Sequence, residues 1–66
     1  MSMQDVVHDL LLEHGYDSPK DRVVEMICYI IPKNIKAEAD EWGWNDTCVR
    51  ESIYAWMKKN VQRGND

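Results

Sequence analysis

ADEWGWNDTCVR, residues 39–50, is the stretch that decides the fold, because it predicts a helix, a sharp turn and the start of a second helix. Gly43 supplies the positive φ that such a turn requires, and Asn45 or Asp46 caps the helix that follows. Ala39 offers a small side chain where the second helix crosses the first, and Val49 fills the angle between them. The spacing therefore predicts two helices that meet at an angle.

This stretch resembles the helix-turn-helix domains found in phage and mobile-element replication and regulatory proteins. The resemblance rests on the spacing of Ala39, Gly43 and Val49, and on a Trp-Gly-Trp turn followed by a polar capping residue and the Val49-Arg50 pair. It covers about residues 19–60, and its specific part is residues 39–50. It is partial: no β-wing follows, Glu38 stands where an apolar residue is commoner, and Glu51 and Asp46 put negative charge where bases are expected.

The resemblance implies a small DNA-binding regulatory protein, phage-related, whose helix-turn-helix spans about residues 33–60. Its last helix would enter the major groove, where Arg50 would bind guanine and Thr47 a phosphate or a thymine methyl. The partner implied is duplex DNA, bound by a homodimer because one helix with few bases binds weakly. The residues implicated are Lys33, Lys36, Thr47, Arg50, Tyr54, Lys58 and Lys59.

Outside this stretch the sequence predicts further helices and no sheet. Apolar residues recur at helical spacing, and the breaks fall at Gly15, Pro32 and Gly43. We expect an all-α fold: one domain over residues 1–66, a small three- to four-helix bundle with a helix-turn-helix core and a flexible tail at 64–66. The expected helices are about 4–13, from Pro19 to about 31, from Pro32 to Gly43, and about 47–62. A β-prone strand over 27–31 is the alternative, disfavoured because a lone strand has nothing to pair with.

The apolar pattern also predicts which residues are buried. The second helix is apolar nearly all round, including Met26, Tyr29 and Ile30, so we expect it to be the central helix. Ile35, Ala39 and Trp42 should form the inner face of the third helix, and Val49, Ile53, Trp56 and Met57 that of the fourth. Cys28 and Cys48 are expected to be reduced core thiols of a cytoplasmic protein.

Acidic residues recur every four positions in the first half of the chain, which carries the whole net charge of −4. One interpretation is a solvated outer face that keeps the protein soluble. The other is a negative stripe that meets a basic surface, which gives the alternative function: a small acidic inhibitor or adaptor, of the phage anti-host or DNA-mimic type, docked on a basic host protein. The residues of this alternative are Asp5, Asp9, Glu13, Asp46 and Glu51. A third hypothesis is self-association through apolar residues such as Leu12, Trp44 and Tyr54.

The sequence lacks the familiar motifs of phosphate-binding, metal-binding and catalytic sites. It has no Gly-rich phosphate loop and no Cys-x-x-Cys pair, and His8 and His14 are too far apart to share metal spacing on one helix face. We interpret His14 as a helix-end residue. We therefore expect no enzyme, no catalytic residues, no metal or cofactor and no small-molecule substrate. No apolar run is long enough to span a membrane, and no secretory signal is expected.

Overall fold

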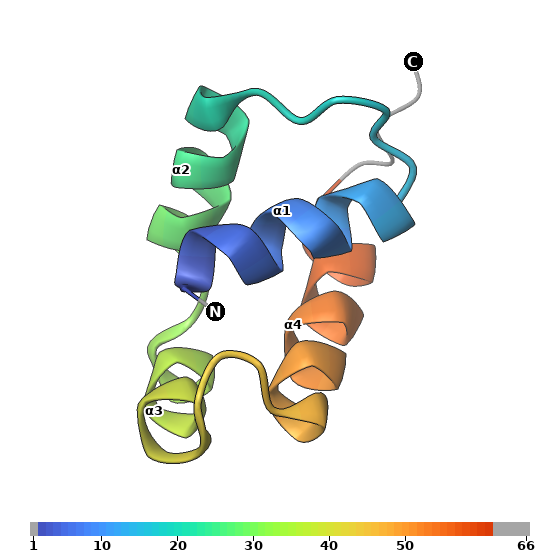
Figure 1. The fold of residues 1–66 in the computed structure, drawn as a ribbon. Coiled ribbons are helices and arrows are strands. Elements are labelled where there is room, and N and C mark those ends of the chain that lie inside the picture. The colour runs from blue at the N-terminus through green and yellow to red at the C-terminus, as the bar shows by residue number, and fades with distance from the viewer. Residues whose placement is uncertain (1, 62–66) are drawn as a thin grey trace.

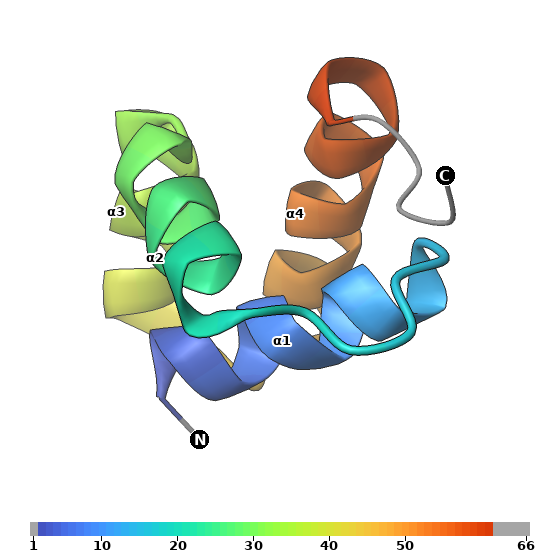
Figure 2. The ribbon, with the colours of Figure 1, turned by 90° about the horizontal axis from the view of Figure 1, so that it is seen from above.

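The computed structural model describes residues 2–61, which form four helices and no strand. These are α1 (Met3–Glu13), α2 (Asp21–Ile30), α3 (Lys33–Trp42) and α4 (Thr47–Asn60). In Figures 1 and 2, α1 crosses between α2 and α4, and it packs against both, while α3 packs against α4. The predicted all-α bundle is thus confirmed, and residues 27–30 are helical rather than a strand.

Local residues set most of the helix ends. The Ser2 side chain accepts a hydrogen bond from the Asp5 amide, 3.3 Å away, and caps α1. His14 ends that helix, and Gly15 follows with a φ of 111°. Pro32 stands directly before α3, where the amide that it lacks is not needed. The predicted stops at these positions are confirmed.

The start of α2 was predicted two residues too early. Pro19 is buried, and Lys20 is still extended (φ −78°, ψ 152°), so the helix begins at Asp21. The Lys20 carbonyl accepts the Val23 and Val24 amides at 2.9 and 3.0 Å. The chain therefore buries Pro19 and is still extended at Lys20 before the helix begins. The predicted end of the last helix at 62 and the tail at 64–66 lie outside the described residues.

The central helix is α1, which corrects the prediction for α2. Val6, Val7 and Leu11 of α1 are fully buried, together with Ile27, Val49, Ile53 and Met57 from other helices. By contrast, Tyr29 of α2 is 84% exposed, Met26 53% and Ile30 45%. The reason is that α2 packs on one side against α1, and no other helix of residues 2–61 covers its outer side. Apolar composition all round the helix did not reveal which side has a neighbour.

Two further burial predictions are wrong. Trp42 is 65% exposed, because it is the last residue of α3 and the chain turns away at Gly43. Trp44, beyond that turn, packs against the core instead. Cys28 is buried as predicted, but Cys48 is exposed in the first turn of α4. Over residues 2–61, no helix combines the length and the apolar character needed to cross a membrane.

Candidate interaction surfaces

The junction of α3 and α4 is a tight turn, visible at the bottom of Figure 1. Gly43 has a φ of 95°; its amide donates to the Ala39 carbonyl at 2.7 Å, and its carbonyl accepts the Asp46 amide at 3.2 Å. Ala39 is 2% exposed and Val49 is fully buried. The predicted bend at Gly43, with a small residue before it and a branched residue after it, is therefore present.

Polar contacts hold this junction together. Oδ1 of Asp46 accepts the Cys48 and Val49 amides at 2.9 and 3.3 Å, so it satisfies the start of α4. Across the two helices, the Ser52 hydroxyl donates to Oε1 of Glu38 at 3.3 Å. Glu38, which stands where an apolar residue is expected, is half-buried and has this hydrogen bond as its structural role.

One side of α4 is open. We call it the outer face of α4; it consists of the exposed residues Thr47, Cys48, Glu51, Ala55, Lys58 and Lys59. Arg50 and Tyr54, two of the predicted DNA-binding residues, are half-buried at the edge that faces α1. The outer face therefore has one carboxylate, Glu51, in its N-terminal half and two ammonium groups at its C-terminal end.

A groove of about 270 Å³ runs between α1 and α4. The Tyr54 hydroxyl lies 3.4 Å from the Glu13 carbonyl, to which it donates, and the Lys58 Nζ lies 5.2 Å from the Tyr54 ring centroid. This groove brings together residues of both functional hypotheses, Arg50 from one and Glu13 from the other. Its lining residues are Leu10, Glu13, Thr47, Arg50, Glu51 and Tyr54.

His14 closes one end of the α1–α4 contact. The side chain is 4% exposed, and its Nε2 lies 2.8 Å from the Val61 carbonyl, a contact that needs the proton on Nε2. The ring also meets the Tyr54 ring edge-on, with centroids 6.1 Å apart. His14 is thus the helix-end residue that the sequence indicated, and it ties the end of α1 to the end of α4.

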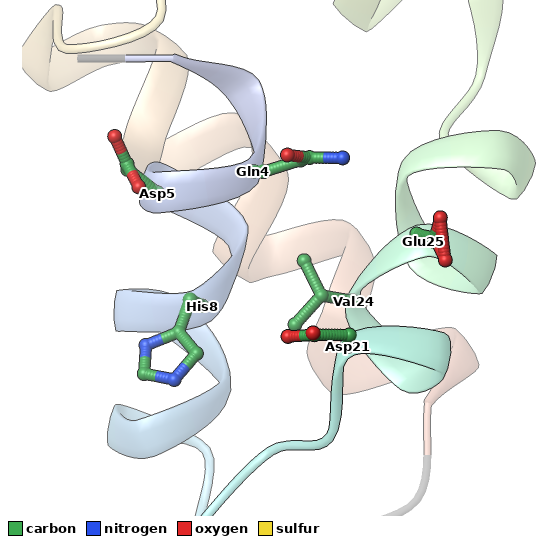
Figure 3. Close-up of a pocket in the computed structure, with 6 residues that line it drawn as sticks. All are labelled: Gln4, Asp5, His8, Asp21, Val24 and Glu25. Carbon is green, nitrogen blue, oxygen red and sulfur yellow. The ribbon is translucent and has the colours of Figure 1, made fainter.

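A second groove, of about 320 Å³, separates the first turns of α1 and α2 (Figure 3). Asp21 and Val24 project from α2 toward α1. Asp5 of the predicted acidic stripe lines this groove with two acidic residues of α2, although its side chain points away from α2, and Asp9 is half-buried outside the groove. Gln4 and His8 were not predicted here, because nothing local shows which turn of α1 faces α2. The lining residues are Gln4, Asp5, His8, Asp21, Val24 and Glu25.

The two lysines of α3 differ in their surroundings. Lys33 is exposed at the first residue of α3, and Lys36 is half-buried one turn later. Lys36 is close enough to Cys28 to act on it: burial raises the pKa of the Cys28 thiol above its ordinary value, and the Lys36 ammonium opposes that rise. Lys36 is therefore less open to solvent than Lys33, and it lies close to a residue of α2.

Within residues 2–61, no three His, Cys, Asp or Glu side chains gather into a metal-binding group. Comparison with known proteins finds no matching family model and no significant match among curated proteins or solved structures.

Proposed function

We propose that this protein is a small helix-turn-helix module that binds duplex DNA through α4 and acts as a regulator. The observation that carries the proposal is the turn at Gly43, with Ala39 and Val49 buried where α3 and α4 meet. A recognition helix has to stand at an angle to its predecessor and leave one side free for the major groove. The turn between α3 and α4 and the exposed outer face of α4 support this proposal.

The distribution of charge favours contact with DNA through α3 and α4, of which α4 carries three cations and one acid and α3 two cations and three acids. Every cation of the proposed site belongs to these two helices: Lys33, Lys36, Arg50, Lys58 and Lys59. Lys58 and Lys59, both exposed in the last turn of α4, suit phosphate contact. Arg50 and Thr47 lie in the first turn of α4 and suit contact with base edges. Glu51 on the same face repels phosphate, so the affinity is expected to be modest and strongly dependent on salt.

Fluorescence anisotropy of labelled duplexes tests this function. A duplex selected from a random pool is expected to bind at micromolar protein in low salt. Replacing Lys58 and Lys59 by Ala should lower the slope of log K against log salt by about 2, whereas Arg50→Ala should cost about 1–3 kcal/mol and relax sequence preference. Lys20→Ala, an exposed cation outside α3 and α4, is the matched control. No binding to selected or random duplex at micromolar protein would disprove the function.

A second candidate function is docking on a basic protein surface. It is favoured by the groove between α1 and α2, whose lining includes the carboxylates Asp5, Asp21 and Glu25 from two helices. A groove lined by several carboxylates complements a basic partner and steers its approach.

Charge reversal of the acidic stripe of α1, which consists of Asp5, Asp9 and Glu13, distinguishes the two candidate functions. Reversal of Asp5, Asp9 and Glu13 to Lys should abolish capture of the basic partner in a pulldown, and reversal of Glu41 and Asp40 on α3 should not. The same triple reversal should strengthen DNA binding by reducing long-range repulsion. Capture that survives the triple reversal removes the docking candidate.

A further inference from the structure

The outer side of α2 is an unpartnered apolar face within the described part of the chain. Tyr29 is 84% exposed, Met26 53% and Ile30 45%, so α2 holds three of the five large apolar residues exposed in the described part of the chain. Met26 and Ile30 are four residues apart, and Tyr29 lies beside them on the same side, so the three form one patch. We call it the α2 patch. Exposed apolar side chains gathered in this way mark an interaction site more often than scattered ones do.

The charges around the α2 patch have opposite signs at its two ends. Asp21 and Glu25 lie toward the N-terminal end of α2, and Lys33 follows directly beyond the C-terminal end, all exposed. The last turn of α2 has no basic residue of its own to complement the negative end of the helix dipole. Arg22 is exposed in the first turn of α2. If a second α2 helix packed antiparallel to the first, its Arg22 would lie near the C-terminal end of the first helix.

We propose that the α2 patch is the interface with a second copy of this chain, with the two α2 helices packed antiparallel. In that arrangement Met26 of one copy packs against Ile30 of the other, and the Tyr29 rings cover the sides. Glu25 of each copy comes within reach of Lys33 of the other, and Arg22 approaches the C-terminal end of the other α2. A purely basic partner would be repelled by Arg22 and Lys33, whereas a second copy satisfies both signs of charge.

The interface is expected to be weak. Three apolar side chains from each copy bury less than the roughly 1,200–2,000 Å² typical of stable complexes. The dimer should therefore form at high protein concentration and dissociate on dilution. The dimer proposal is independent of the proposed contact with DNA, because α4 is not part of the dimer interface and dimer formation is measured without DNA.

Sedimentation equilibrium over a concentration series up to millimolar protein tests the interface. The mass should approach that of two chains at the highest concentrations. Tyr29→Glu and Met26→Glu should each return it to one chain, with helicity by circular dichroism unchanged because both side chains are exposed. Leu12→Glu, at an apolar residue of α1 that is 43% exposed, is the matched control and should still dimerise.

Charge exchange tests the antiparallel arrangement. Glu25→Lys and Lys33→Glu should each weaken the dimer, and the double variant should recover it, because the two residues meet only between copies. A monomer at millimolar protein overturns the proposal and assigns the patch to another protein. A dimer lost in Leu12→Glu but kept in Tyr29→Glu, or a double variant no better than the single ones, overturns it equally.

Discussion

At the scale of single residues, Gly43 has the backbone conformation that is hardest to replace. Its φ of 95° and ψ of 146° belong to a region that residues with a Cβ rarely adopt. A Cβ built there meets no atom within 4 Å, so the cost of a substitution is conformational and not steric. Gly43→Ala should therefore lower the free energy of unfolding by about 1–3 kcal/mol. Urea unfolding measures it, and Glu41→Ala, exposed near the end of α3, should change little; equal stability of the two variants would contradict this account.

Asp46 has two potential roles that substitutions can separate. Its carboxylate caps α4 through the Cys48 and Val49 amides, and its negative charge belongs to the acidic docking hypothesis. Asp46→Ala should cost about 1 kcal/mol of stability, while Asp46→Asn keeps an oxygen acceptor and should cost much less. Thermal unfolding followed by circular dichroism gives both values. Asn45→Ala is the control, because Asn45 is an exposed neighbour of Asp46 and is not the N-cap residue of α4. If Asp46→Asn costs as much as Asp46→Ala, the charge and not the cap is what stabilises α4.

At the scale of helices, the two cysteines report which side of each helix is covered. Cys48 in the first turn of α4 is exposed, and Cys28 of α2 is buried. A thiol reagent at neutral pH should label Cys48 within minutes and Cys28 only as the protein opens, and labelling in denaturant should equalise them. Fast labelling of Cys28 under native conditions would mean that α2 does not pack on α1 as described. Mass spectrometry after digestion identifies the labelled residue.

Burial of Cys28 also links stability to alkaline pH. Because burial raises the pKa of the Cys28 thiol, the unfolded chain releases that proton at a lower pH than the folded chain does. The free energy of unfolding should therefore be unaffected by this group at neutral pH and should fall as pH rises above about 8.5, the ordinary thiol range. The comparison of wild type with Cys28→Ala, each unfolded in urea from pH 7 to 10, isolates this contribution. A difference in stability that stays constant over that range would contradict it.

The helices show what the sequence could and could not predict. Their ends follow from residues that act on their own neighbours, such as Gly15, Pro32, Gly43 and Asp46, and these were predicted. The covered side of α2 depends on where α1 lies, which no residue of α2 encodes, so Tyr29 was expected inside. The same holds for the candidate site. Thr47, Lys58, Arg50 and Tyr54 were all predicted to contact DNA. Thr47 and Lys58 are exposed, but Arg50 and Tyr54 are half-buried because α1, a distant segment of the chain, approaches them.

At the scale of the whole molecule, net negative charge is concentrated on α1 and α2, because most of the cations, including those of the proposed site, belong to α3 and α4. Asp5, Asp9 and Glu13 follow one another at four-residue spacing along α1, so neighbouring carboxylates repel each other. A chain with a net charge of −4 also repels itself as it compacts. Stability should therefore increase with added salt, because ions screen repulsion between exposed charges.

The variant Asp9→Lys tests this balance directly. It turns two repulsive pairs of α1, with Asp5 and with Glu13, into two attractive ones, and should add about 1–2 kcal/mol of stability at low salt. Asp9→Asn removes the repulsion without adding attraction and should give about half of that gain. Both gains should shrink in half-molar sodium chloride, where the charges are screened. Thermal unfolding at low and high salt decides the matter: a gain that persists in high salt would come from packing of the new side chain, and the acidic stripe would then impose no electrostatic cost on the fold.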